Sequence, residues 1–352
     1  MTSQAAPRFK LGQRKQLCLS EESLVTLSTF GEAKHLPLVV QPAVRGVSLS
    51  NWLSNRRDFI HEAILQHGAV LFRGFGVEIP EELQATVTVL CGEAMAYKER
   101  SSPRSQVAGN VYTSTDYPRD EEIFPHNEHS YSKRFPMKLF FCCQTPAANG
   151  GTTPLIDTRR VYKKIPDDVR SEFERKGWMF VRNFNTGFGL SWQTVFQTTD
   201  QAEVEEYCRS ANIEWEWLGG DRLRTRQVRP SAIQHPVTGE CVWFNHATFF
   251  HVTTLKPSLL KILRSSFTED QMPNNTFFGD GSAIPDDVVE RLRHAYLSER
   301  VSFPWEKGDL IVLDNVLTAH GRDTYSGPRK ILFAMAEMVE RDLARELAAL
   351  AR

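Results

Sequence analysis

Short runs of strand-forming residues, separated by Gly, Pro and Asn, dominate the chain from about Ala94 onward. The clearest of these runs lie at 111–118, 138–146, 151–158, 178–184, 240–245, 309–315 and 329–336. Many short strands divided by turn residues are typical of a β-sandwich or a β-barrel. The spacing therefore predicts a mainly β protein with one large sheet system.

Helical patterns accompany these strands. Apolar residues recur with helical spacing, and Gly or Pro marks several boundaries. Helices are expected at 48–67, 80–91, 200–211 and 285–298. The first of them ends at Gly68 and leads into a buried strand at 69–72. Because the last two interrupt the strand-rich part, we predict that 185–300 is a mixed helical insertion or lid between core strands.

The expected organisation is a single domain. Residues 1–35 resemble a loose lead-in, 36–342 form the domain, and 343–352 form a tail. Lys plus Arg (42) nearly equals Asp plus Glu (43), so the net charge is only −1. Such a chain has no strong field for a phosphate backbone, and we expect no nucleic-acid partner.

Location and redox setting follow from what the sequence contains. The N-terminal residues lack the apolar stretch of a signal peptide, and no run of 18 apolar residues occurs. None of the six cysteines forms a C-x-x-C pair. We therefore expect a cytoplasmic protein with reduced thiols and no membrane span, and the sequence leaves its oligomeric state open.

A candidate metal site lies in the run Pro-His-Asn-Glu-His-Ser-Tyr at 125–131. On an extended strand the side chains of His126 and Glu128 would point to the same face. Of the ten histidines, only His126 is followed two residues later by Asp or Glu. A further His from elsewhere would complete the 2-His-1-carboxylate facial triad of ferrous oxygenases, which leaves positions for a bidentate co-substrate and O2.

The best candidate for that further ligand is His320. It follows a buried strand and a turn at Asp314-Asn315, which would bring it back on the returning strand. Other histidines are weaker candidates. His61 and His67 are six residues apart, so they would point about 120° apart on a helix rather than forming H-E-x-x-H. His129 would face away from Glu128 on a regular strand.

His246 and His251, in Phe-Asn-His-Ala-Thr-Phe-Phe-His, remain possible pocket residues. A 2-oxoglutarate co-substrate also needs a cation and a hydroxyl for its distal carboxylate. Arg329 follows a Ser-Gly-Pro turn nine residues after His320, and its planar guanidinium suits a bidentate carboxylate contact. The hydroxyl would come from Thr153 or Thr152, after a Gly-Gly turn, and spacing alone leaves both open.

Together these segments resemble the taurine dioxygenase and clavaminate synthase-like superfamily of Fe(II)- and 2-oxoglutarate-dependent oxygenases. The resemblance runs from about Ala69 to Ala336 and rests on AVLFRGF, PHNEHSY, GGTTPLIDTR, LDNVLTAHGRDTYSGPRKIL and their order. It implies a double-stranded β-helix (jelly-roll) core. It also implies that iron binds His126, Glu128 and His320, and that the 2-oxoglutarate carboxylate binds Arg329 and a Thr after the Gly-Gly pair, favouring Thr153.

Two residues depart from the family pattern. The acidic ligand is Glu128 rather than the more usual Asp, and Phe333 stands where several members carry a second Arg. Glu at this position resembles clavaminate synthase and SyrP-like enzymes, which hydroxylate an amino acid in nonribosomal peptide assembly. Related halogenases lack the carboxylate ligand, so no halogenase activity is expected.

The implied reaction converts 2-oxoglutarate and O2 to succinate and CO2 and hydroxylates an unactivated C–H bond. The resemblance suggests an amino acid substrate, free or as an aminoacyl group on a peptidyl carrier protein. Candidate substrate contacts are Asn110, Tyr131, Asn245 and Arg322, which lie near the motif segments. Alternatives are an epoxidase or desaturase on the same fold, a cupin-like metal-binding protein without turnover, and a zinc hydrolase, which would have no use for Arg329.

Overall fold

The computed structural model describes residues 21–30, 35–95, 105–114 and 117–342 and confirms the expected mainly β fold with a jelly-roll core. The main sheet has eight strands. In spatial order these are β1 (Val25–Thr29), β2 (Leu38–Pro42), β3 (Ala69–Phe72), β16 (Leu310–Asp314), β7 (Arg134–Thr145), β19 (Lys330–Glu340), β5 (Val111–Thr113) and β4 (Gln106–Ala108). Adjacent strands of this sheet pair antiparallel, except that β2 and β3 pair parallel. The central strands therefore come from both halves of the chain.

A second, three-stranded sheet lies against the inner face of the main sheet. Its order is β6 (Ile123–His126), β17 (Thr318–Arg322) and β9 (Leu155–Asp157). A short ribbon of β8 (Asn149–Gly150) and β18 (Tyr325–Ser326) continues beside it. Leu155 packs in one buried cluster with inward residues of the main sheet, and the ring of His320 on β17 lies 4.9 Å from that of Phe141 on β7. The space between the two sheets is thus the jelly-roll interior.

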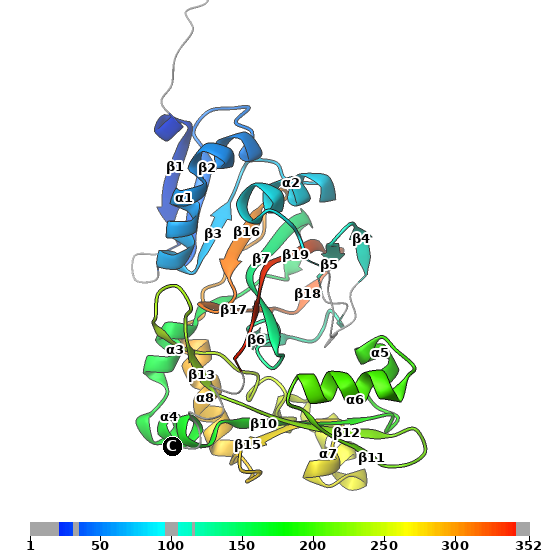
Figure 1. Cartoon of the computed structure of the whole chain (residues 1–352). Helices are drawn as coiled ribbons and strands as arrows, with labels where there is room; N and C mark the ends of the chain where they lie inside the picture. The colour runs from blue at the N-terminus through cyan, green and yellow to red at the C-terminus, as the bar shows by residue number, and fades with distance from the viewer. Residues whose placement is uncertain (1–20, 31–34, 96–104, 115–116, 343–352) are drawn as a thin grey trace, which may run out of the picture.

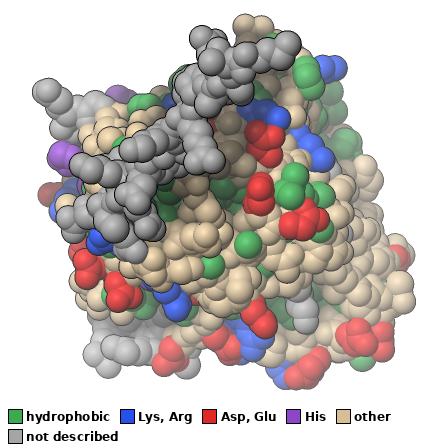
Figure 2. Space-filling view, turned by 90° about the horizontal axis from the view of Figure 1, so that it is seen from above, with side chains coloured by type: hydrophobic (Ala, Val, Ile, Leu, Met, Phe, Trp, Pro, Cys, Tyr) green, Lys and Arg blue, Asp and Glu red, His purple; other side chains and the backbone are tan. Residues whose placement is uncertain are grey.

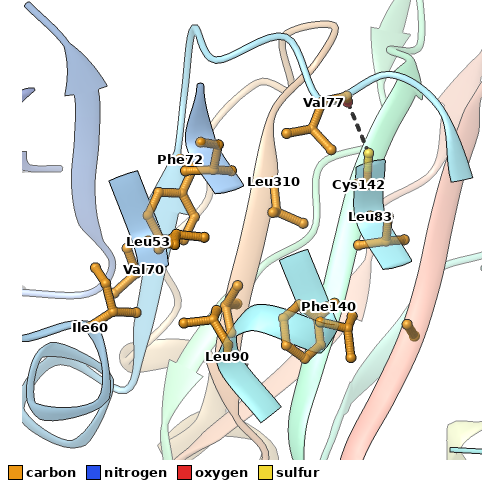
Figure 3. Close-up of a cluster of buried hydrophobic side chains, with 14 of the residues drawn as sticks. Leu53, Ile60, Val70, Phe72, Val77, Leu83, Leu90, Phe140, Cys142 and Leu310 are labelled. Carbon is orange, nitrogen blue, oxygen red and sulfur yellow. Dashed lines mark hydrogen bonds between the residues drawn. The ribbon is translucent and has the colours of Figure 1, made fainter. Parts of the chain in front are cut away.

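Side chains of the central strands alternate between two buried layers. The inner layer holds Leu71, Phe141, Ile311 and Phe333 among others, and these residues face the second sheet. The residues that alternate with them along each strand belong to a second cluster on the opposite face, as Figure 3 shows for Phe72, Phe140 and Leu310. Burial on both faces explains the nearly continuous apolar runs in these strands.

Two helices cover the outer face of the main sheet (Figure 1). They are α1 (Leu49–His67) and α2 (Pro80–Cys91), as the sequence predicts. The hydroxyl of Ser48 accepts from the Asn51 N–H at the start of α1, and Gly68, with φ of 79°, ends that helix. The carboxylate of Glu82 accepts main-chain N–H groups just before α2. Both boundaries therefore follow from local capping.

The segment between β9 and β16 forms a separate layer, in the lower part of Figure 1. Its four-stranded sheet has the order β11 (Glu214–Trp217), β12 (Leu223–Arg229), β10 (Trp178–Phe184) and β15 (Asn274–Phe278). Its helices are α3 (Thr158–Lys164), α4 (Asp167–Lys176), α5 (Trp192–Phe196), α6 (Gln201–Ser210), α7 (Pro257–Ser266) and α8 (Asp286–Ser298). It also holds the pair β13 (Ala232–Gln234) and β14 (Cys241–Trp243), and the 3-10 turns η2 (Val252–Thr254) and η3 (Glu269–Gln271).

The structure modifies two expectations about organisation. The run at 178–184 is a strand, but it pairs with β12 and β15 in the inserted layer instead of joining the core. The inserted layer thus begins before the predicted residue 185. Within the predicted lead-in, residues 25–29 form β1, which pairs with β2 along its whole length. Residues 1–20 and the tail at 343–352 lie outside the described residues.

Charges on the surface are mixed. On the face shown in Figure 2, acidic and basic side chains alternate and neither sign forms a large continuous patch. Among the described helices, none combines the length and the apolar character that a membrane crossing requires.

Candidate active site

The three predicted metal ligands meet at one point. His126 on β6 and His320 on β17 are direct partners in the antiparallel register, and their ring centroids are 4.7 Å apart. With Glu128, each offers a ligand atom, and these atoms all lie within 4.8 Å of one another. Glu128 is 2% exposed and His320 is 4% exposed. One half-buried imidazole, one buried imidazole and a buried carboxylate converging on one point form a suitable donor set for ferrous iron.

The route by which Glu128 reaches this point differs from the prediction. β6 ends at His126, so Glu128 lies in the turn after the strand and not on an extended strand with His126. His129, the next residue, adopts a left-handed φ of 57°. The turn redirects the chain, and the Nε2 of His129 lies 3.5 Å from a Glu128 carboxylate oxygen instead of facing away.

The environment of His126 leaves one nitrogen for a metal. Its Nδ1 lies 2.9 Å from the main-chain oxygen of Phe124, and in the tautomer that carries the proton on Nδ1 this nitrogen donates to that carbonyl, so Nε2 is the nitrogen that can act as a ligand. The rings of His246 and Phe249, from the inserted layer, lie 5.5 and 4.6 Å from the His126 ring. The inserted layer therefore forms one wall of the site.

Arg329 and Thr153 lie together in the same cavity. The Nε of Arg329 donates to the Gly151 carbonyl at 2.9 Å, and a terminal nitrogen lies 3.4 Å from the Thr153 hydroxyl. Trp305, which no sequence motif singles out, donates its indole N–H to the same hydroxyl at 3.1 Å. These contacts leave terminal N–H groups of Arg329 for a carboxylate.

The guanidinium of Arg329 has no carboxylate within 4.0 Å among the described residues. Burial, with the nearby charge of Arg322, lowers the pKa of Arg329 to about 10. Arg73 provides a contrast, because burial lowers its pKa but Asp309, 2.7 Å away, raises it above the ordinary value overall. A cation removed from most of the solvent normally has a partner, so the partly buried Arg329 fits an anionic ligand such as the distal carboxylate of 2-oxoglutarate.

The local geometry also distinguishes the two candidate threonines. Thr153 lines the cavity, whereas the Thr152 hydroxyl donates to the carboxylate of Asp323. Gly151, with φ of 66°, allows Arg329 to pass closely, because a Cβ there would lie 3.0 Å from the Arg329 Cδ. The Gly-Gly pair thus serves the approach of Arg329 as well as the turn.

Two neighbouring cavities connect these groups. The inner one, of about 30 Å³, is lined by His126, His320, Thr153 and Arg329, with Ile123, Phe141 and Ile331 as apolar walls. The outer one, of about 320 Å³, shares Arg322 and Arg329 with the first and extends past Tyr117 and Lys330. Together they lead from the candidate metal ligands past Arg329 toward the surface.

The other candidate histidines make structural contacts. His246 shares a hydrogen bond with the Ser130 hydroxyl, and burial lowers its pKa well below the ordinary value. His251 caps η2, and burial lowers its pKa to about 4. His61 and His67 lie on α1 with main-chain contacts to Leu90 and His35 respectively. Among the described residues, His126, Glu128 and His320 are the group whose ligand atoms meet.

The predicted substrate contacts are placed unevenly. Arg322 lines both cavities, but its terminal nitrogens donate to the carbonyls of residues 117, 118 and 121. The amides of Asn110 and Asn245 bond main-chain atoms of Ala94, Ser231 and Ala247, so they support loops. Tyr131 is buried against the rings of His246 and Phe250. Of the four, only Arg322 lines the cavities.

Known proteins resemble this chain over nearly its full length. The protein-family model "Taurine catabolism dioxygenase TauD, TfdA family" matches residues 32–335. The dapdiamide synthesis protein DdaC of Enterobacter agglomerans is 37% identical over 87% of this chain and 92% of its own length. A clavaminate synthase-like protein of Arabidopsis thaliana is 25% identical over 87% of this chain and 95% of its own length.

The fold also matches a solved structure. PvcB of Pseudomonas aeruginosa superimposes with a TM-score of 0.56 at 14% identity, covering 92% of this chain and 94% of that one. A second PvcB structure describes that protein as an Fe, α-ketoglutarate-dependent oxygenase from an isonitrile synthetic pathway. Likeness at this identity establishes the fold, and the family match with the 37% relative establishes membership. The chain belongs to the TauD, TfdA family and is an Fe(II)- and 2-oxoglutarate-dependent oxygenase that uses O2.

Proposed function

We propose that this oxygenase hydroxylates an unactivated C–H bond of an amino acid, either free or carried as an aminoacyl group on a carrier protein, in the biosynthesis of a natural product. The observation that carries the oxygenase chemistry is the meeting of His126, Glu128 and His320 beside a partly buried Arg329 without a carboxylate partner among the described residues. A hydrolase or a simple metal-binding protein would have no use for that guanidinium.

The roles of the residues follow from their contacts. His126, Glu128 and His320 would hold the iron, and the Phe124 carbonyl keeps the His126 ring oriented. Arg329 and Thr153 would bind the distal carboxylate of 2-oxoglutarate. When bound, iron and 2-oxoglutarate supply the O2-dependent oxidation of a C–H bond, with succinate and CO2 as co-products. The rings of His246 and Phe249 shield the His126 side from water.

The relatives support the biosynthetic setting, and the resemblance to amino acid hydroxylases supports the substrate class. DdaC is a dapdiamide synthesis protein and PvcB comes from an isonitrile synthetic pathway, so both belong to natural-product pathways. The acidic ligand Glu128 adds the resemblance to amino acid hydroxylases. Epoxidation and desaturation use the same metal site and are separate outcomes of the test below.

The test measures succinate formed from 2-oxoglutarate after anaerobic loading with Fe(II) and addition of O2. Free amino acids and matched aminoacyl carrier proteins form the substrate panel, and mass spectrometry follows the product. The gain of one oxygen atom at a saturated carbon is the expected result. Loss of two hydrogen atoms would identify a desaturase, and oxygen added across a double bond would identify an epoxidase.

A matched pair of variants controls the assay. His126→Ala should abolish substrate-dependent succinate, whereas His61→Ala removes a histidine outside the cavity and should retain it. If the protein binds metal and 2-oxoglutarate but no panel member stimulates succinate formation, the proposed substrate class is wrong while the cofactor site stands.

A further inference from the structure

Asn315 holds the turn that carries Glu128. The Glu128 N–H donates to the side-chain oxygen of Asn315 at 2.7 Å, and the Asn315 amide nitrogen donates to the Glu128 carbonyl at 2.8 Å. One side chain thus binds both main-chain polar groups of the predicted carboxylate ligand. This matters because β6 ends at His126, so β-sheet pairing does not fix Glu128.

Asn315 is itself fixed by the surrounding core. Its amide nitrogen also donates to the Pro136 carbonyl at 2.8 Å, and its main-chain N–H donates to Met137. The amide of Asn127 in turn donates to the Asn315 carbonyl at 2.6 Å. Asn127 and Asn315 are both completely buried. Buried hydrogen bonds of this kind are costly to break, since the remaining groups lose their partners without gaining water.

The position of Asn315 in the chain links two ligands. It lies between β16 and β17, five residues before His320, while its side chain reaches the turn at Glu128. The segment that delivers one candidate ligand therefore also places another. We propose that Asn315 is a positioning residue, whose amide sets the distance between the Glu128 carboxylate and the two histidines. Metal affinity depends on such supporting contacts, because small displacements of a ligand weaken coordination.

The experiment compares metal affinity in Asn315→Ala and Asn183→Ala. Asn183 is a matched control in the inserted layer, 4% exposed, whose amide donates to the carbonyls of Asp270 and Met272 and accepts from Arg224. Both substitutions remove three amide hydrogen bonds from a buried asparagine. Only the one at Asn315 touches a metal ligand.

The apo proteins are titrated anaerobically with Co(II) and with Mn(II), by calorimetry and by the visible absorption of Co(II). We expect Asn315→Ala to lower the affinity for both metals by about 10- to 100-fold and to change the shape of the Co(II) absorption band. Asn183→Ala should retain the affinity and the spectrum of the unaltered protein, although thermal unfolding should show both variants to be destabilised. These readouts do not require turnover, so they are independent of the proposed substrate.

Asn315→Asp decides the matter if the alanine variant does not fold. It keeps the size of the side chain and can still accept from the Glu128 N–H, but it cannot donate to the carbonyls of Glu128 and Pro136. We expect weaker metal binding and an altered Co(II) spectrum here as well. Unaltered affinity and spectrum in a folded Asn315 variant would overturn the proposal and leave Asn315 a purely structural residue.

Discussion

At the scale of single residues, the metal site depends on the reach of Glu128. Its turn is held from the main chain, and its carboxylate still meets the two imidazoles. Glu128→Asp shortens the side chain by about 1.5 Å, and the held backbone cannot follow. We expect Mn(II) affinity to fall by about 10- to 100-fold, measured by calorimetry on the apo protein. Equal affinity in the two proteins would show that the turn moves to compensate.

The two neighbouring threonines give a second prediction at this scale. Thr153→Val removes the hydroxyl that lies beside Arg329, whereas Thr152→Val removes one that bonds Asp323. A lost hydrogen bond to a charged carboxylate should weaken 2-oxoglutarate binding by about 10-fold or more in Thr153→Val. Anaerobic titration of the Mn(II)-loaded variants measures this. The opposite result, with the loss in Thr152→Val, would assign the contact to Thr152.

At the scale of elements, the connection from β16 to β17 rests on Asp314. One carboxylate oxygen accepts from the N–H groups of Val316 and Leu317, and the other lies 2.8 Å from Lys138 and 3.2 Å from His235. Burial favours the neutral acid, but Lys138 and His235 prevail and lower the pKa of Asp314 to about 2. The ionised form therefore stabilises the fold at neutral pH.

Asp314→Asn tests this contribution. At pH 7 we expect a loss of about 3–5 kcal/mol in the free energy of unfolding, because Lys138 stays buried without its partner. The group's folded pKa lies below its unfolded one, so its stabilisation is complete above the unfolded pKa and is lost as pH falls toward 2. Urea titrations should show the difference narrowing by about 1 kcal/mol between pH 7 and pH 3. A constant difference would refute the electrostatic account.

Elements with strong local signals were predictable. The helices at 49–67 and 80–91 carry their own caps, and the core strands β16 and β19 are apolar because both faces are covered. The placement of β10 was not predictable, since its partners β12 and β15 are distant in sequence. β1 was missed because, at a sheet edge, its central residues are exposed and resemble a loop.

The candidate site was predictable to a similar depth. The spacing of His126 and Glu128, with His320 after a buried strand, was enough to choose the three residues that meet. The turn at Glu128 was not predictable, because it depends on contacts with Asn315 from far along the chain. Polar residues beside motifs, such as Asn245, satisfy buried main-chain groups, and sequence alone cannot tell that use from ligand binding.

At the scale of the whole molecule, the metal site joins distant parts of one fold. β6 and β17 bring His126 and His320 together across 194 residues of chain. Arg329 lies immediately before β19, which begins at Lys330. The unfolded chain cannot keep these groups at one point. Metal and 2-oxoglutarate should therefore bind the folded protein and not the unfolded chain. Their binding free energy then adds to the free energy of unfolding.

This coupling predicts that metal raises the thermal unfolding midpoint first, and that 2-oxoglutarate adds to it afterwards. Mn(II) at about 100 times its dissociation constant should add about 2.7 kcal/mol, which raises the unfolding midpoint of a chain of this size by about 3 to 5 °C. 2-Oxoglutarate should raise the midpoint further only when Mn(II) is present, because in the proposed site one end would bind the metal while the other would bind Arg329, and both lie in one cavity. Scanning calorimetry of the chelator-treated protein measures both steps, and His320→Ala should show neither. An equal shift with 2-oxoglutarate alone would mean that Arg329 binds it without the metal, and the two parts of the site would then act independently.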